Sequence, residues 1–322
     1  MKRSLSDIVL FLIAAGLLAA LIASSNPESI AKNLSRADLT VVAAALFVTL
    51  VIICVKIVRW NILLGSVGIE LALKQAAGPY MASLFVSNIT PGRVGEPIRS
   101  YYLKKSLGHH ISKTLPTVVM ERIMDLSAVV IFCIFGLFAL STTSNPILLA
   151  GIGAMVTGLV VVTGVSLNKK LLNKLLRASY FFLKYVPNIK KLTFKFEKIA
   201  DNFHSGFGII SKSRQMPLLF MITLSGWLME FSIMKLAFIS IGLDIDFFTI
   251  ASVASLATVV SLLTFLPGNI GSFEASSAIL MSQAVPGLDL AAATSGILIY
   301  RFSSLIFALI VTSGSFLEYQ RT

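Results

Sequence analysis

The sequence reads PGRVGEPIR at 91–99 and PGNIGSFE at 267–274, each directly after an apolar stretch. A Pro-Gly pair removes a backbone donor and loosens the chain, so it ends a helix. Broken helices at membrane depth are tolerated only where protein or a water-filled cavity satisfies the freed backbone groups. We therefore expect each pair to form the tip of a re-entrant helical hairpin. The expected halves are 75–90 and 94–115 in the first hairpin, and 247–266 and 270–287 in the second.

The composition around these breaks is that of a membrane protein. Of 322 residues, 56% are apolar and 13% are charged, whereas soluble domains carry about 25% charged residues. The apolar runs are near the length that spans a bilayer, about 20 residues. We expect an all-α polytopic membrane protein forming one membrane domain over 1–322. Besides the two hairpins, the six expected full spans are 8–24, 39–59, 117–140, 147–167, 217–241 and 290–316.

The N-terminal run also resembles a secretory signal peptide, because Met1-Lys2-Arg3 precedes the apolar segment 8–23. The small residues at 23–26 form only a weak cleavage pattern, so a retained first helix is favoured. Cys54 and Cys133 both lie in apolar runs and are expected to pack as small hydrophobic residues rather than form a disulfide.

The basic residues predict the orientation. With a cytoplasmic N-terminus, 23 of the 27 Lys and Arg fall in cytoplasmic loops and helix ends, eleven of them in the loop 168–216. Two (Lys32 and Arg36) fall outside, and two (Lys235 and Arg301) fall within spans. The positive-inside rule therefore favours a multi-pass cell-membrane protein with its N-terminus in the cytoplasm.

The loop 168–216 carries an apolar stripe at helical spacing, flanked by lysines and an arginine, between Lys170 and Val186. This pattern predicts a helix in the cytoplasmic headgroup layer. The alternative is an ordinary basic inner loop. Nucleic-acid binding is not expected, because membrane proteins need basic inner loops anyway.

The two halves of the chain resemble each other, as an internal repeat over about 39–140 and 217–316. The matches are 66–70 with 240–244, 91–95 with 267–271, and Arg122 with Arg301, at offsets of 174, 176 and 179. The charge rule places Glu70 inside and Asp244 outside, so the repeats are expected to be inverted. Inverted repeats with broken helices are typical of secondary transporters, whose site lies near the midplane. A duplicated scaffold without transport is the alternative.

The first break carries candidate phosphate-binding residues. Arg93, Glu96 and Arg99 recur at spacing three and share one face if the second half-helix begins here. Helix N-terminal amides favour an anion, and two guanidinium groups bind a phosphate bidentately. The alternative is a set of interfacial charges at a helix stop.

Acidic residues open the next span, where Glu121, Arg122 and Asp125 are spaced to form one local network. The carboxylates are expected either to hold the arginines of the first break or to pair with a substrate amine. Glu230 and Lys235, within the span 217–241, form a further candidate pair.

In the second half, Asn269 and Glu274 follow the break, and Tyr300 and Arg301 lie well inside the last span. An ionisable residue at membrane depth is costly and is a site candidate by default. We expect Arg301 to pair with Glu274. We also expect both, with Arg93 and Arg99, to converge on one polar cavity with more arginine than carboxylate.

No hydrolytic triad, Walker sequence or metal-ligand spacing is recognisable, so no enzymatic activity, metal or cofactor is expected. The motifs as a set resemble the lysylphosphatidylglycerol synthase transmembrane (flippase) family over about 5–317. The residues that carry the resemblance are Arg93, Glu96, Arg99, Glu121, Arg122, Asp125, Glu274, Tyr300 and Arg301. Asn269 stands where a second arginine would complete a symmetric pair of phosphate clamps.

The resemblance implies a flippase for charged phospholipids or lipid-linked precursors, binding them at these residues. The expected partners are anionic or aminoacylated phospholipids or polyprenyl-phosphate conjugates, with a homo-oligomer as a further possibility. No counterpart of the soluble aminoacyl-transfer domain of the synthase is recognisable, so lysine transfer to lipid is not expected. Two alternatives stay open: a non-transporting subunit that scaffolds a lipid-modifying or glycosyl-transfer enzyme, and an intramembrane enzyme.

Overall fold

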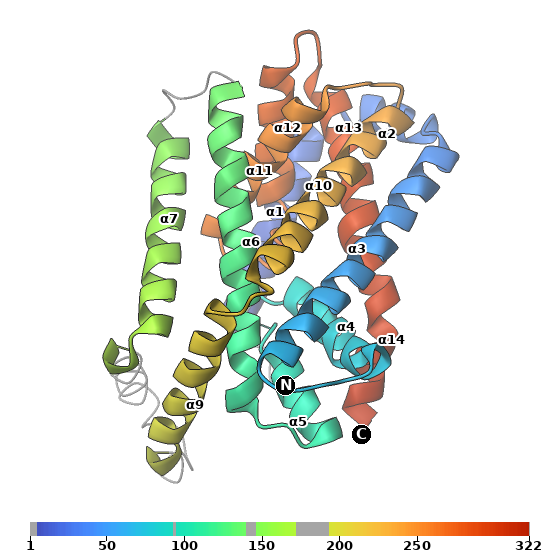
Figure 1. Ribbon diagram of the computed structural model, residues 1–322. Coiled ribbons are helices and arrows are strands. Elements are labelled where there is room, and N and C mark those ends of the chain that lie inside the picture. Colours follow the sequence, from blue (N-terminus) through green and yellow to red (C-terminus); the bar gives the residue numbers. More distant parts are fainter. Residues whose placement is uncertain (1–4, 93–94, 140–145, 172–192, 322) are drawn as a thin grey trace.

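Helices dominate the residues that the computed structural model describes, which are 5–92, 95–139, 146–171 and 193–321 (Figure 1). This confirms the expected all-α class. In chain order the helices are α1 (Leu5–Ser24), α2 (Pro27–Ser35), α3 (Leu39–Ser66), α4 (Leu73–Ile89), α5 (Ile98–Leu107), α6 (Ile111–Ala139), α7 (Pro146–Leu167), α9 (Thr193–Ser211), α10 (Met216–Ser240), α11 (Phe247–Leu263), α12 (Ser272–Ala284), α13 (Leu290–Arg301), the π-helical turn η2 (Phe302–Ile306) and α14 (Phe307–Arg321).

Several of these helices have the length and hydropathy of membrane spans. Within the described residues, Leu39–Ser66, Met216–Ser240 and Leu290–Tyr319 each pass this test alone. The apolar part of α1 passes it together with α2, although the two helices are bent by 88°. Helices α6 and α7 run lengthwise beside this set (Figure 1). Each of the six predicted spans therefore coincides with a long helix, and the first of them belongs to the bent pair of α1 and α2.

The two predicted hairpins are present and meet at their tips. Helix α4 ends at Ile89 and packs against α5, and α11 ends at Leu263 and packs against α12. An isolated antiparallel bridge joins Pro91 to Pro267. In Figure 1, α5 lies at the lower end of the molecule and α12 lies toward the upper end, so the hairpins enter from opposite ends.

The packing of the two repeats is reciprocal. Helix α4 of the first repeat packs against α14 of the second, and α11 of the second packs against α6 of the first. The remaining long helices of the two repeats, α3 and α10, pack against each other. Each hairpin is thus held by the long helix of the other repeat, as expected for inverted repeats that form one unit.

Some predicted boundaries are wrong. The segment 94–115 is not one half-helix, because Gly108 adopts a left-handed conformation, with φ 75°, and ends α5 after only ten residues. The last predicted span is one helix, Leu290–Tyr319, but the unpredicted π-helical turn η2 lies within it. Helix α2 was not predicted. Its N-cap is Asn26, whose side chain accepts a hydrogen bond from the amide of Ser29 at 3.3 Å.

Two large clusters of buried apolar residues form most of the core, and a third, smaller one lies on α6, α7 and α11. One large cluster is built mainly on α10, α11 and α13, around Phe238 and Ile297. The other large cluster is built mainly on α3, α6 and α9, around Trp60 and Phe207. The polar cavity described below is lined by residues of both repeats.

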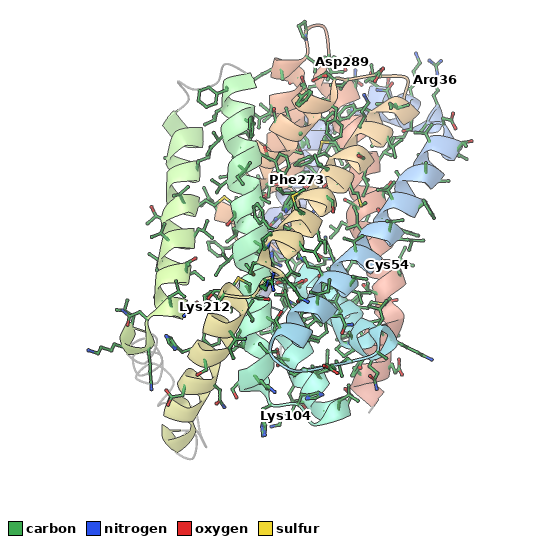
Figure 2. All side chains as sticks on the ribbon, in the orientation of Figure 1. Arg36, Cys54, Lys104, Lys212, Phe273 and Asp289 are labelled. Atoms are coloured by element: carbon green, nitrogen blue, oxygen red, sulfur yellow. The ribbon has the colours of Figure 1, made fainter. Side chains whose placement is uncertain are left out.

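Figure 2 places Lys104 at the lower end of the molecule and Arg36 and Asp289 at the upper end. The predicted orientation requires this separation, since Lys104 was assigned to the cytoplasm and Arg36 to the outside. Which end faces the cytoplasm stays a prediction. The predicted headgroup-layer helix falls mostly on 172–192, outside the described residues.

The tip of the second hairpin leads to a stability prediction. Gly268 has φ +58°, and a Cβ added there would lie 2.8 Å from the backbone oxygen of Asn88. Gly268→Ala should lower the free energy of unfolding by at least the left-handed cost of about 1–2 kcal/mol. Gly164→Ala is the control, because that helical glycine faces open space and alanine there should stabilise by about 0.5–1 kcal/mol. Equal unfolding temperatures for both purified variants would contradict the observed contact between the tips.

The separation of charged ends leads to a topology prediction. In a variant without native cysteines, Lys104→Cys should be protected from a membrane-impermeant thiol reagent in intact cells. Arg36→Cys should react with the same reagent, and permeabilised cells provide the control in which both react. Labelling of residue 104 but not of residue 36 in intact cells would reverse the assigned orientation.

Candidate functional site

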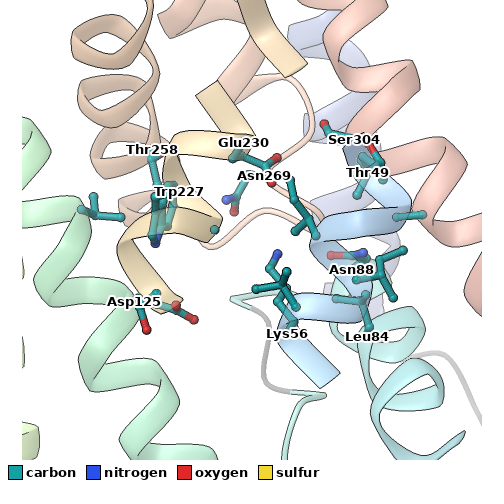
Figure 3. Close-up of a pocket in the computed structure, with 18 of the residues that line it drawn as sticks. Thr49, Lys56, Leu84, Asn88, Asp125, Trp227, Glu230, Thr258, Asn269 and Ser304 are labelled. Atoms are coloured by element: carbon teal, nitrogen blue, oxygen red, sulfur yellow. The ribbon is translucent and has the colours of Figure 1, made fainter. Parts of the chain in front are cut away.

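A cavity lies where the two hairpin tips meet (Figure 3), and charged and polar groups from both repeats line it. The ionisable and amide residues of its lining are Lys56, Arg59, Asn88, Arg122, Asp125, Glu230, Asn269, Tyr300 and Arg301. The helices that contribute them are α3, α4, α6, α10 and α13, together with the tip of the second hairpin. The cavity therefore belongs to both repeats.

The lining is arranged in pairs related by the internal repeat. A residue of α3 and the residue 174 positions later in α10 both line the cavity, and the same holds for α4 and α11. Between α6 and the last span the offset is 179. These pairs are Thr49 with Thr223, Ile52 with Gly226, Ile53 with Trp227, Lys56 with Glu230, Leu84 with Thr258, Asn88 with Leu262, Arg122 with Arg301, Asp125 with Ser304, Leu126 with Leu305, and Val129 with Ala308. The cavity thus lies where the two repeats face each other, which is where transporters with inverted repeats bind substrate.

Arg301 and Glu274 form the predicted ion pair. Nε of Arg301 lies 2.5 Å from Oε1 of Glu274, and Nη2 donates to the carbonyl of Gly268 at 2.6 Å. The other carboxylate oxygen of Glu274 accepts the amide of Gly271 at 2.7 Å, closing the N-terminus of α12. The guanidinium also lies over the ring of Phe273, 5.3 Å from its centroid. These contacts fix Arg301 against the tip of the second hairpin.

The first repeat contains the corresponding pair, between Arg122 and Glu96. The side chains of Arg122 and Glu96 are 28% and 15% exposed, more than the 11% and 3% of Arg301 and Glu274. Each hairpin is therefore tied to a long helix of its own repeat by an arginine that also lines the cavity. Arg122 pairs with Glu96 in addition to its electrostatic interaction with Asp125, its predicted neighbour on α6. Glu121 pairs with Arg99, an arginine of the first break, which is one of the two roles predicted for the carboxylates of α6.

A second charged group, formed by residues of the first repeat, begins in the cavity lining and extends behind it. Arg59, 4% exposed, contacts Glu121 at 3.1 Å and Asp125 at 2.7 Å. Glu121 also pairs with Arg99, whose guanidinium lies 4.9 Å from the ring centroids of both Trp60 and Tyr80. Shared carboxylates offset the cost of burying two arginines at this depth.

Arg99 does not reach the cavity, so the predicted convergence of Arg99 with Arg301 is wrong. The predicted common helical face of 93–99 is also wrong, because α5 begins only at Ile98. Glu96 therefore precedes the helix, and Glu96 and Arg99 contact different residues of α6. Arg93 lies outside the described residues.

The predicted pair of Glu230 with Lys235 is wrong as well. Lys235 Nζ lies 3.2 Å from Asp244 beyond the end of α10, and Glu230 accepts a hydrogen bond from the hydroxyl of Tyr300 at 2.9 Å. Asn269 is 7% exposed, has φ 55° and lines the cavity as predicted for a site residue.

Of the predicted site residues that the structure describes, the cavity lining contains Arg122, Asp125, Asn269, Tyr300 and Arg301. Glu96 and Glu274 lie behind it as partners of the two arginines. Lys56 and Arg59 were missed, because the predicted span ended at 59 and placed both at a helix end. The helix continues to Ser66, so both lie inside it, where an ionisable residue indicates a site.

Among the described residues, the lining itself holds three arginines, Arg59, Arg122 and Arg301, against two carboxylates, Asp125 and Glu230, so the predicted excess of arginine is present there. The charges balance once the partners behind the lining are counted. Five cations lie in or behind the lining: Lys56, Arg59, Arg99, Arg122 and Arg301. Five carboxylates accompany them: Glu96, Glu121, Asp125, Glu230 and Glu274. The cavity thus offers both signs of charge at short range.

The fold and this cavity define a polytopic α-helical membrane protein with inverted repeats, opposed hairpins and a charged central site. The sequence matches the family described as the lysylphosphatidylglycerol synthase TM region over residues 8–312. The chain belongs to this family.

The chain is also similar to archaeal membrane proteins of a family called UPF0104. It is 25% identical to one from Methanothermobacter thermautotrophicus over 291 residues, covering 86% of this chain and 85% of the relative. It is 26% identical to UPF0104 membrane protein PH1989 of Pyrococcus horikoshii, covering 77% and 78%. For UPF0104 membrane protein MJ1078 of Methanocaldococcus jannaschii the identity is 23%, covering 71% and 93%. These matches support an integral membrane location.

The shared carboxylate of Glu121 leads to a prediction. Glu121→Gln should leave Arg59 and Arg99 buried without that charge, a loss of about 3–5 kcal/mol for a broken buried pair. Thermal unfolding of the purified protein measures it. Asp244→Asn is the control, because Asp244 is 81% exposed and its pairing with Lys235 should contribute little. Equal unfolding temperatures for the two variants would contradict a buried role for Glu121.

Proposed function

We propose that this chain moves a charged phospholipid, or a polyprenyl-phosphate lipid precursor, between the two leaflets of the cell membrane. The headgroup binds in the cavity between the hairpin tips. The observation that carries the proposal is the pair of repeat-related arginines, Arg122 on α6 and Arg301 on α13, which line one cavity and are each paired with a carboxylate of the hairpin in their own repeat. The family description, which refers to a lipid synthase, agrees with a lipid as the substrate.

The chemistry of Arg301 suits a phosphate. A guanidinium has five N–H donors in a planar fork, and its contacts with Glu274 and Gly268 use only two of its nitrogens. A phosphate oxygen at the cavity wall can accept from the remaining donors. The nearby carboxylates lower the net charge of the site, so a bare anion is favoured less than a headgroup that also carries a donor.

The carboxylates provide the complementary contact. Asp125 and Glu230 line the same cavity from α6 and α10, and the side chain of Asp125 is 22% exposed. A carboxylate there can accept hydrogen bonds from an amine or a sugar hydroxyl of the headgroup. Anionic, aminoacylated and sugar-bearing phospholipids are therefore the substrates to test first.

The arrangement of the hairpins supports movement rather than a static scaffold. Each tip contacts the other at Pro91 and Pro267, and the two hairpins enter from opposite ends. Rocking of one repeat against the other would expose the same cavity to each leaflet in turn, as in other transporters with inverted repeats. A subunit that only scaffolds an enzyme does not need a charged cavity between its two repeats.

Lipid movement in proteoliposomes tests the proposal. The purified chain should exchange fluorescent phosphatidylglycerol and its aminoacylated form between leaflets, measured by reduction of the outer-leaflet fluorophore. Arg301→Ala should slow exchange by about tenfold or more, the loss of a charged hydrogen bond to phosphate. Arg301→Lys should recover little, because an ammonium lacks the bidentate fork.

Arg36→Ala is the matched control, since Arg36 is exposed at the upper end of the molecule and away from the cavity. It should exchange lipid at the wild-type rate. Exchange by Arg301→Ala at the wild-type rate would reject the site. Protein-free vesicles in each series give the background rate of exchange. Against that rate, a variant that keeps its activity can be told apart from a wild-type protein that has none.

A further inference from the structure

Two seams between long helices border the cavity, and the internal repeat relates them. One is between α6 and α10, and the other is between α14 with η2 and α3. At the second seam, Oγ1 of Thr49 donates directly to the carbonyl of Ser303 at 3.0 Å. That direct hydrogen bond joins α3 to η2 beside the cavity, so the seam is closed there.

The first seam has no such direct contact at the related position among the described residues. Thr223, the counterpart of Thr49, is instead bridged to α6 through Arg59. Nη1 of Arg59 donates to Thr223 at 2.9 Å and to Asp125 at 2.7 Å. Further along the seam, the rings of Phe132 and Phe231 meet edge to face, with centroids 5.0 Å apart.

These two contacts lie about two helical turns apart. From Asp125 to Phe132 is seven residues, about 10 Å along α6 at the usual helical rise. Between them the cavity lining consists of Leu126 and Val129 of α6 and Gly226, Trp227 and Glu230 of α10, so it is apolar except for Glu230. Ile222 of α10 extends the apolar lining just before Thr223.

A glycine lies at the centre of this stretch. Gly226 lines the cavity, and a Cβ added there would meet no heavy atom within 4 Å. Its counterpart by the repeat is Ile52 of α3, which is 3% exposed and also lines the cavity. At this pair of positions the second repeat thus has open space where the first has a bulky side chain.

We propose that the α6–α10 seam is a lateral portal that holds an acyl chain of a lipid whose headgroup occupies the cavity. The proposal rests on the proposed function, because the headgroup must reach the cavity with its chains still in lipid. The α3–α14 seam is the closed counterpart in this conformation.

The occupant follows from the chemistry of the walls. Leu126, Val129 and Ile222 lie beside the charged lining, so the combined site has one polar and one apolar part. Water against the apolar part is unfavourable, whereas a hydrocarbon chain buries that surface. An inorganic phosphate or a free headgroup would leave the apolar part unfilled. An amphiphile fills both.

Photo-crosslinking tests the portal without requiring transport. The protein is placed in nanodiscs with phosphatidylglycerol carrying a diazirine near the end of one acyl chain, and adducts are mapped by mass spectrometry. Val129 is 1% exposed, so it should be labelled only if a chain enters the seam. Phe135 on the same helix is 69% exposed and reports ordinary lipid contact. Labelling of both residues supports the portal.

Gly226→Leu should reduce adducts at Val129 by about tenfold while leaving those at Phe135 unchanged, because the added side chain fills the seam. Gly158→Leu on α7 is the matched control, since its Cβ position is also open but does not line the cavity. It should leave both sites labelled. If labelling at Val129 survives Gly226→Leu, the assigned path is wrong.

Photo-crosslinking of the wild-type protein tests the portal even if the Gly226→Leu variant fails to fold. Labelling of Phe135 without Val129 in the wild type overturns the portal, whether or not the protein moves lipid in liposomes. Labelling of Val129 in a protein that moves no lipid supports the seam as a chain-binding site and rejects the transport function. The two proposals therefore fail by different measurements.

Discussion

The backbone freed at two helix breaks inside a membrane must find partners within the protein, and this constraint determines what surrounds the cavity. Lipid offers no hydrogen bonds, so each break needs internal donors and acceptors. The second tip uses charged side chains for this purpose: Arg301 donates to the carbonyl of Gly268, and Glu274 accepts the amide of Gly271. In the first tip the hydroxyl of Thr90 accepts the amide of Gly95. The charges that hold the second tip also line the cavity or lie directly behind it.

The hairpins, the repeat and the pairing of Arg301 with Glu274 could be predicted from sequence because each depends on local chemistry. Pro-Gly stops a helix wherever it occurs, and an arginine deep in a span demands a partner. The roles of Lys56 and Arg59 could not be predicted, because hydropathy does not locate the end of α3 within a few residues. The partners of Arg99 depend on tertiary packing against Trp60, which no spacing rule contains.

The two repeats have diverged where they face each other. Lys56 of the first repeat corresponds to Glu230 of the second, so the pseudo-symmetric cavity has opposite charge at this pair of positions. Glu230 in turn accepts a hydrogen bond from Tyr300. A site with both signs of charge orients a dipolar headgroup, whereas a strictly symmetric one would bind it equally well in two reversed poses.

The π-helical turn η2 has a separate geometric consequence. This π-helical turn of five residues contains about one residue more than a turn of α-helix. Because each residue of an α-helix advances by about 100°, the side chains before the turn are rotated by about that angle relative to those after it. Helix α13 can then direct Arg301 toward the second hairpin while α14 presents its aromatic residues to the first, as in the stacked rings of Phe316 and Phe85. The directions in which side chains point before the turn and after it are thereby set independently in one span. Such a span can serve two interfaces whose ideal helical phases do not agree.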